Sequence, residues 1–254
     1  MTDVHPPTSV LFALLADARL PTGGHTQSAG LEPALLAGLS VADVPGYVGG
    51  RLATVTRTEA AVAVVARHVA LGDPDERVAG LRATWDAWAA RTPAPALRET
   101  SQRLGRGYLR LAHRLWGAHP AVVALDAAVV AERTRLAASV PVLTGPVGRS
   151  DRAQPPRPLV LGVVGACVGL DARQVAQLVG YDDVQTIASA TLKLAPVDPA
   201  EATGWVVAAA PTVEAMAAGV AHLTDPGDIP ASGAPLLEEW AQQHARRTER
   251  LFSA

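Results

Sequence analysis

The sequence is poor in several residue types that usually reveal a protein's chemistry. Among its 254 residues it has a single cysteine and only 4% aromatic side chains. One cysteine, Cys167, excludes a disulfide within the chain and fits a reducing compartment, because structural disulfides persist mainly in oxidising ones. Of the 22 lysines and arginines, Lys193 is the only lysine. It therefore stands out as a position to examine.

Long apolar runs are also missing. The longest, residues 159–170, has 12 residues, whereas a helix needs roughly 20 to cross a bilayer. The first residues lack the basic segment that leads into the apolar stretch of a secretory signal. A net charge of −2 offers no basic excess for neutralising phosphates. We therefore expect a cytoplasmic protein that binds neither membranes nor nucleic acid.

Sequence motifs for catalysis and metal binding are absent. The chain has no H-E-x-x-H, C-x-x-C or G-x-S-x-G, and no two of its seven histidines are four residues apart. Gly23-Gly24 is not followed by the lysine of a P-loop. The sequence predicts no catalytic residue, no metal site and no stably bound cofactor within one subunit. A metal site shared across subunits by His5 or His25 stays open.

Asp182-Asp183 partly matches the Asp-Asp-x-x-Asp motif with which helical prenyl-chain enzymes hold magnesium and a diphosphate. Thr186 occupies the position of the third aspartate, so the motif supplies too few carboxylates for a hard cation. We favour a helix N-cap at these aspartates. A helical prenyl-diphosphate enzyme remains an alternative function.

Apolar residues recur mainly at helical spacing, which predicts an all-α fold. We expect a single domain over residues 1–254, built as a bundle of about ten helices, with Asp171 and Asp198 as N-caps. The expected helices cover residues 9–19, 27–38, 43–70, 75–91, 96–116, 119–139, 158–169, 171–180, 182–194, 198–210 and 212–223, with a last helix from 235.

Two segments rich in proline and glycine interrupt this pattern. Residues 141–158 predict a mobile loop. Residues 224–234 predict a flexible lead-in to a C-terminal tail, 224–254, that orders on binding a partner. On the last helix apolar and charged residues share one face, as in helices that bind another protein.

Residues 96–116 are predicted as an amphipathic helix. One stripe is apolar, and a second carries four arginines at helical spacing, among them Arg103 and Arg106. Ser101, Gly105 and Ala112 lie close together and would let another helix approach. The arginine stripe fits either a solvated face or a docking surface for an acidic partner.

Residues 20–32, LPTGGHTQSAGLE, predict a tight bend between two short helices. Proline restricts φ at position 21, and the two glycines permit backbone angles that other residues avoid. Thr26 or Ser28 is placed to cap the second helix, and Glu32 falls near its positive end.

This bend and the end of the chain, where Pro235-Leu236-Leu237-Glu238 is followed by His244 and by Arg250-Leu251-Phe252, resemble the urease accessory protein F (UreF) family. Two internal segments, around Arg103-Leu104-Gly105-Arg106 and around Lys193, occur in the order found in the family. The resemblance covers about the whole chain. It implies an all-α, non-enzymatic protein.

By this resemblance the chain acts in urease maturation and is required for nickel insertion into apo-urease. It would form a homodimer that bridges a nickel-carrying GTPase (UreG) and a second scaffold (UreD, also called UreH) and regulates the GTPase. Nickel is then the cargo of the complex. A generic all-α adaptor unrelated to urease is the other alternative.

The resemblance also implies the residues that contact partners. The bend is the foremost candidate for contact with a partner, and Arg103, Arg106 and Lys193 come second, as the source of charge-assisted bonds to carboxylates. The tail is expected to bind the second scaffold. The bend residues are Gly23, Gly24, His25, Ser28, Gly30, Leu31 and Glu32, and the tail residues are His244, Arg250, Leu251 and Phe252.

Overall fold

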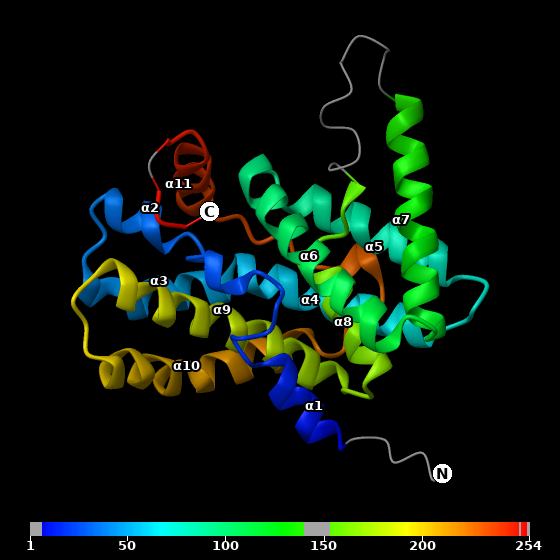
Figure 1. Ribbon diagram of the computed structural model, residues 1–254, viewed down its shortest axis with the longest axis horizontal. Helices are drawn as coiled ribbons and strands as arrows, with labels where there is room; N and C mark the ends of the chain where they lie inside the picture. The colour runs from blue at the N-terminus through cyan, green and yellow to red at the C-terminus, as the bar shows by residue number, and fades with distance from the viewer. Residues whose placement is uncertain (1–6, 140–152, 249, 253–254) are drawn as a thin grey trace.

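The predicted all-α bundle of about ten helices is confirmed. The computed structural model describes residues 7–139, 153–248 and 250–252, and no strand occurs within them. Figure 1 shows α10 along one edge of the molecule, beside α9, with α11 on the opposite side over α2 and α6. The α-helices are α1 (Thr8–Leu15), α2 (Leu31–Leu36), α3 (Val44–Ala53), α4 (Val55–Leu71), α5 (Arg77–Arg91), α6 (Pro95–Trp116), α7 (Pro120–Ser139), α8 (Arg157–Cys167), α9 (Ala172–Leu194), α10 (Pro199–Val220) and α11 (Pro235–Ala245).

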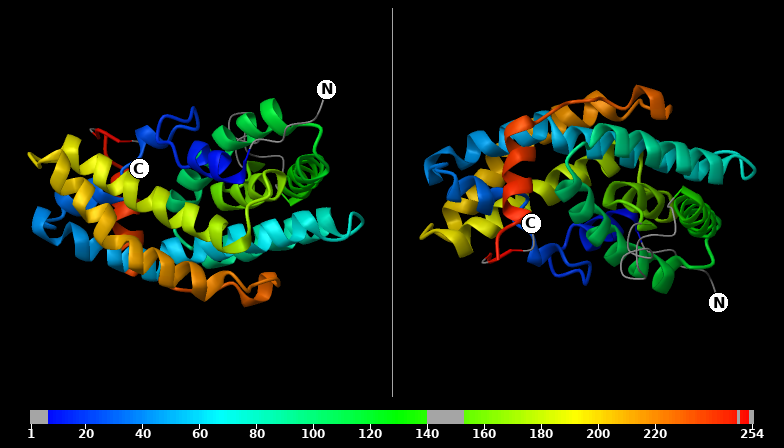
Figure 2. Two further views of the ribbon diagram at one scale, coloured as in Figure 1. Left: turned by 90° about the horizontal axis from the view of Figure 1, so that it is seen from below. Right: turned by 90° about the horizontal axis from the view of Figure 1, so that it is seen from above.

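Helices α4, α8 and α9 form the centre of the bundle (Figure 2). In α4 the seven residues from Ala60 to Ala66 are all buried, and α8 is buried along most of its length. A helix that is apolar on every side must be surrounded by other elements. Gly162 lets α8 approach α4, because a Cβ there would lie 2.2 Å from the carbonyl oxygen of Ala63.

Helix α6 holds two outlying segments through its glycines. A Cβ at Gly105 would lie 2.0 Å from the carbonyl oxygen of Pro155, and one at Gly107 would lie 2.2 Å from that of Thr22. The predicted close approach at Gly105 is thus made by the segment leading into α8. Gly107 brings α6 against the 20–32 bend.

Several helix boundaries differ from the prediction. The expected helix over 43–70 is split at Thr54, whose backbone leaves the helical region at φ −124° and ψ −97°. Helix α9 runs through Tyr181, and α10 runs through Pro211. Packing explains the continuity, because α9 and α10 lie against each other and Gly180 fits beside Val213.

Two of the three N-cap predictions are confirmed, and the third is wrong. Asp171 and Asp198 each accept a hydrogen bond from a backbone N–H of the following helix, so both predicted N-caps are confirmed. The N-cap assigned to Asp182-Asp183 is wrong. Both aspartates lie in the interior of α9, where the backbone N–H groups already have helical partners.

The two predicted irregular segments are described in part. Of the loop 141–158, residues 141–152 lie outside the described residues, and Ala153, Pro155 and Pro156 are buried before α8 begins. The lead-in 224–234 packs on the bundle. Arg91 donates hydrogen bonds to the carbonyl oxygens of Gly227 and Ile229, and Ile229 is buried.

Candidate functional site

The bend between α1 and α2 is built on left-handed glycines. Gly23 has φ +92° and Gly30 has φ +76°, a region that is costly for residues with a Cβ. At Gly30 a Cβ would also lie 2.9 Å from the hydroxyl oxygen of Tyr47. That hydroxyl donates to the carbonyl oxygen of Ala29 at 2.8 Å, so α3 holds the bend in place.

Glu32 joins this bend to the end of the chain. Its carboxylate accepts hydrogen bonds from the backbone N–H groups of Leu251, at 2.7 Å, and Phe252, at 2.9 Å. The ring nitrogen Nε2 of His244 lies 3.4 Å from the same carboxylate. Glu32, His244 and Phe252 are all buried. The bend and the tail, which the sequence presents as separate segments, therefore form one unit.

An open groove lies on the surface of this unit. The Lys193 ammonium sits 5.2 Å from the centre of the Phe252 ring and 3.4 Å from the carbonyl oxygen of His25. Such a cation over an aromatic ring is held electrostatically while it stays accessible to water. The residues that line the groove are His25, Thr26, Lys193, Arg250, Leu251 and Phe252.

Positive charge from α6 extends the groove. Burial and the charges of Arg250 and Arg106 lower the pKa of Arg103, although Glu99 opposes them. Since Coulombic effects decline with distance, these three guanidinium groups must share one region. Cations from α6, α9 and the tail thus gather beside the bend on one side of the molecule. A surface of this kind suits a partner that presents carboxylates.

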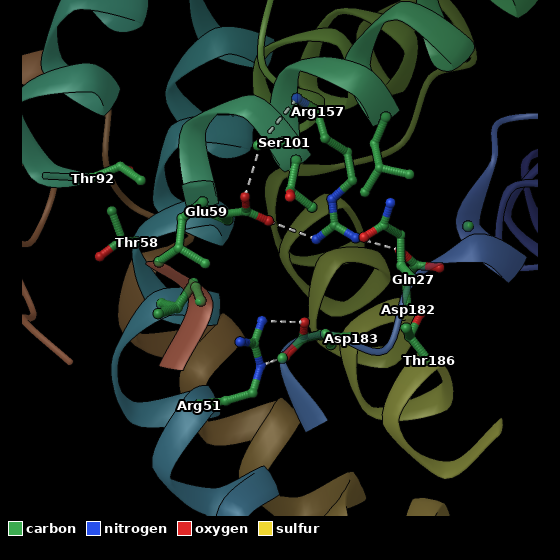
Figure 3. Close-up of a pocket in the computed structure, with 18 of the residues that line it drawn as sticks. Gln27, Arg51, Thr58, Glu59, Thr92, Ser101, Arg157, Asp182, Asp183 and Thr186 are labelled. Carbon is green, nitrogen blue, oxygen red and sulfur yellow. Dashed lines mark hydrogen bonds and ion pairs between the residues drawn. The ribbon is translucent and has the colours of Figure 1, made fainter. Parts of the chain in front are cut away.

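A cavity inside the bundle is lined by several charged side chains (Figure 3). Arg51 of α3 makes a two-pronged pair with Asp183, at 2.7 and 2.9 Å, and Thr56 donates to the same carboxylate at 2.6 Å. Arg157 of α8 pairs with both Glu59, at 2.7 Å, and Asp182. Five charged groups from α3, α4, α8 and α9 therefore meet inside the bundle.

The two neighbouring aspartates of this cavity differ in charge preference. Burial opposes ionisation of Asp183, but the Arg51 guanidinium and its hydrogen bonds outweigh burial and lower its pKa. Burial raises the pKa of Asp182, and Arg157 offsets that effect only in part. Asp183 is hence the firm counter-ion of the network, and Asp182 is the carboxyl group that takes up a proton more readily.

The cavity and the groove are linked by a third hollow. This hollow shares Thr22, Gln27, Tyr108 and Asp182 with the cavity, and His25, Lys193 and Phe252 with the groove. The three hollows therefore adjoin one another between the surface and the buried ion pairs. The bend forms one wall of all three.

The predicted site residues fall into three groups. Ser28, Leu31, Glu32, His244 and Phe252 are buried and make contacts within the chain, so they shape the surface from beneath. The exposed ones are His25, Arg103, Arg106, Lys193, Arg250 and Leu251, and Gly23, Gly24 and Gly30 set the backbone of the bend. The structure brings the bend, Lys193 and the tail together, and contact with a partner stays a prediction.

The residues of the buried network, Arg51, Glu59, Arg157 and Asp182, were not predicted as site residues. Asp182-Asp183 was the one signal in the sequence, because two adjacent carboxylates within an apolar helix need partners. Nothing in the spacing singles out Arg51 or Arg157 among so many arginines. Their roles follow from packing alone.

The described ranges 7–139, 153–248 and 250–252 offer neither a cluster of metal ligands nor a membrane-spanning helix. They contain no group of three or more His, Cys, Asp or Glu side chains placed to hold a metal ion. Over the same ranges no helix has both the length and the apolar character needed to cross a membrane.

These features place the chain among all-α proteins that have a charged surface groove and buried ion pairs, and comparison with known proteins gives the family. A family model of UreF matches residues 39–210. The chain is 32% identical over 249 residues to the urease accessory protein UreF of Mycobacterium sp. (strain JLS), covering 97% of this chain and 99% of that protein. This chain belongs to the UreF family of urease accessory proteins.

Two further relatives agree over nearly the same length. The urease accessory protein UreF of Mycobacterium tuberculosis (strain H37Rv) is 32% identical over 248 residues, with 94% of this chain and 95% of that protein covered. That of Mycolicibacterium vanbaalenii is 31% identical over 247 residues, with 95% and 96% covered. The resemblance inferred from the bend and the tail is therefore confirmed.

Proposed function

We propose that this chain is a non-catalytic scaffold of urease maturation in the cytoplasm, required for the insertion of nickel into apo-urease. In this proposal it works as a homodimer that bridges a UreG-like GTPase and a UreD/UreH-like scaffold and regulates the GTPase. Nickel passes through the complex as cargo and is not a resident cofactor of this chain.

The observation that carries the proposal is the contact of the Glu32 carboxylate with the backbone N–H groups of Leu251 and Phe252, which we call the joint at Glu32. It unites the bend, Lys193 and the tail, and so builds a cationic groove with the exposed Leu251 at its edge and the buried Phe252 in its lining. Interfaces commonly combine aromatic or aliphatic anchors with arginine contacts. The membership in the UreF family supplies the biological setting.

The two partners are assigned to two sides of this joint. We assign the bend, Lys193, Arg103 and Arg106 to the GTPase, because the last three provide cations for an acidic surface beside the bend. We assign the exposed side of the tail, around Leu251, to the second scaffold. The joint at Glu32 then couples the two sides, since a change in the tail alters the floor of the groove.

The enzyme alternative is disfavoured by the ion pairs. A magnesium–diphosphate site needs carboxylates that are free to bind the cation. Asp182 and Asp183 are instead neutralised by Arg157 and Arg51 of the same chain. A generic adaptor unrelated to urease is disfavoured by the family.

The experiment that tests the proposal is a pull-down of the purified chain with its candidate GTPase and scaffold, followed by light scattering after size exclusion. We expect a complex with two copies of each chain. The chain alone should also restore urease activity in a strain that lacks its gene. Failure to bind either folded partner, or to restore activity, would overturn the proposal.

A variant pair sharpens this test. Leu251 is 62% exposed, so Leu251→Ala should weaken scaffold binding and spare GTPase binding. Deletion of residues 235–254 is a less specific test, because it would also remove the buried His244 and Phe252. Equal loss of both partners in Leu251→Ala would contradict the division of the surface.

A further inference from the structure

The C-terminal tail contributes to the walls of all three spaces described above. Ser232 of the lead-in and Ala241 of α11 line the cavity, and Phe252 lines both the third hollow and the groove. The ion pairs inside the cavity belong instead to α3, α4, α8 and α9. The tail therefore forms part of the cover over a charged interior that other helices build.

This cover is the weakly buried end of the molecule. Among the 11 residues of α11 only Ala241 and His244 are buried, whereas ten of the 11 residues of α8 are. Helix α11 packs mainly against α6 and α2, on the outside of the bundle (Figure 1). An element with few buried apolar contacts opens locally at a lower free energy than the core. The tail can thus detach while α4, α8 and α9 stay packed.

The contacts that hold the tail are largely polar. Arg91 and Thr58 donate hydrogen bonds to carbonyl oxygens of the lead-in. At the other end the joint at Glu32 holds two backbone N–H groups, and the Lys193 ammonium lies 5.2 Å from the centre of the Phe252 ring. Hydrogen bonds of this kind are replaced by bonds to water when they break, so their net cost is modest.

The Phe252 ring separates the groove from the third hollow. His25, Lys193 and Phe252 line both spaces. His25 and Lys193 are exposed, whereas Phe252 is only 4% exposed. On its inner side the hollow reaches Tyr108 and Asp182, which also line the cavity. Withdrawal of the ring would therefore join the open groove to a space that contacts the buried ion pairs.

The bend is the other cover on this side, and it is held more firmly. The Tyr47 hydroxyl donates to the carbonyl oxygen of Ala29, and α6 approaches the backbone of Thr22 closely at Gly107. The tail is accordingly the part that moves. Stability alone explains the interior poorly, because apolar residues of similar volume often replace buried ion pairs without loss. A charged cavity beneath a detachable cover is suited to controlled access.

We propose that the tail is a lid whose local release opens the ion-pair cavity to water and small solutes, with the Phe252 ring as its stopper on the side of the groove. Asp182 is then the first charged group of the network to be reached, since it lines both the hollow and the cavity. A partner that takes over the Leu251 and Phe252 amides from Glu32 would hold the lid open. The inference goes beyond the proposed function, because it concerns a motion of the chain itself.

Thiol labelling tests the lid. Thr186 lines both the cavity and the third hollow, so Thr186→Cys combined with Cys167→Ala places a single thiol behind Phe252. A bulky aromatic disulfide reagent should label this thiol slowly while the tail is in place. Phe252→Ala and Glu32→Gln should each accelerate labelling by roughly five- to a hundredfold, because each removes a contact that keeps the tail closed.

Two controls separate the lid from general loosening. Leu251 precedes Phe252 but is 62% exposed, so Leu251→Ala should leave the labelling rate unchanged. The native Cys167, in a chain without the new thiol, reports on opening of the bundle itself, and Phe252→Ala should not change its rate.

The inference is overturned if Phe252→Ala labels no faster, if Leu251→Ala accelerates labelling equally, or if Cys167 accelerates in parallel. The labelling uses the chain alone. A chain that binds neither candidate partner would therefore refute the proposed function and leave the result on the lid standing.

Discussion

The carboxylate of Glu32 accepts a hydrogen bond from the backbone N–H of Leu251 at 2.7 Å, across 219 positions of sequence. This contact closes the chain on itself and sets the floor of the groove. If such a buried carboxylate loses its charge, the fold loses stability, because the backbone N–H groups that donate to it are left with a weaker acceptor or none. The behaviour of this joint is therefore the first property to test.

Glu32→Gln should release the end of the chain. The amide keeps the shape of the side chain, but its NH2 group only donates hydrogen bonds. The amide therefore cannot accept from the two backbone N–H groups with two oxygen atoms, as the carboxylate does. We expect a loss of about 1–3 kcal/mol at the joint and faster hydrogen exchange at the Leu251 and Phe252 amides. Glu239→Gln on the exposed side of α11 is the control. Unchanged exchange in Glu32→Gln would contradict the role of the joint.

Asp183→Asn and Asp182→Asn should differ sharply. Asp183→Asn leaves the buried Arg51 without its counter-ion, which costs about 3–5 kcal/mol. Asp182→Asn should cost clearly less, because Arg157 keeps Glu59 as a partner and burial already disfavours the charge of Asp182. Urea unfolding at pH 7 measures both, and an equal loss would count against this account.

The pH dependence of stability should follow Asp183. Its pKa is lower in the folded chain than in the unfolded chain, so its contribution is complete above the ordinary aspartate pKa of about 4. That contribution is lost as the pH falls further through the lower, folded value. We expect the unfolding free energy to fall on acidification below about pH 4, with a shallower slope for Asp183→Asn. The same slope in both proteins would refute the assignment.

Gly107→Ala should push the bend away from α6. Its methyl group would lie 2.2 Å from the carbonyl oxygen of Thr22, and such overpacking typically costs about 1–3 kcal/mol. Gly24→Ala is the matched control, because it adds the same methyl group to the bend with nothing within 4 Å. Thermal unfolding should separate the two variants. If the two variants lose the same stability, the close contact between α6 and the bend does not hold the bend in place.

Lys193→Ala should weaken binding of the acidic partner without altering the helical content. Loss of one charge-assisted contact is worth about 1.5–3 kcal/mol, or roughly ten- to a hundredfold in affinity. The affinity of the unaltered chain should also fall with added salt, as expected for exposed charges. Arg133→Ala on α7 removes an exposed cation outside the groove and serves as the control. Equal binding by both variants would exclude Lys193 from the interface.

Much of the fold could be predicted because it depends on local spacing. The apolar stripe of α6 and the N-cap aspartates of α9 and α10 are properties of a few neighbouring residues. The errors arose where packing overrides local preference. Gly180 and Tyr181 look like a break, yet α9 continues because α10 covers it; Thr54 looks helical, yet the chain bends there.

The sequence alone determined the helical class, the family, and the three segments that mark the site: the bend, Lys193 and the tail. Each of these features depends on residues that lie close together along the chain. Only the tertiary structure decided that the three form one groove, that Glu32 faces inward to hold the tail, and that Asp182 and Asp183 pair with Arg157 and Arg51. Those pairings join residues up to 220 positions apart, and no local spacing specifies which partner a buried charge will meet.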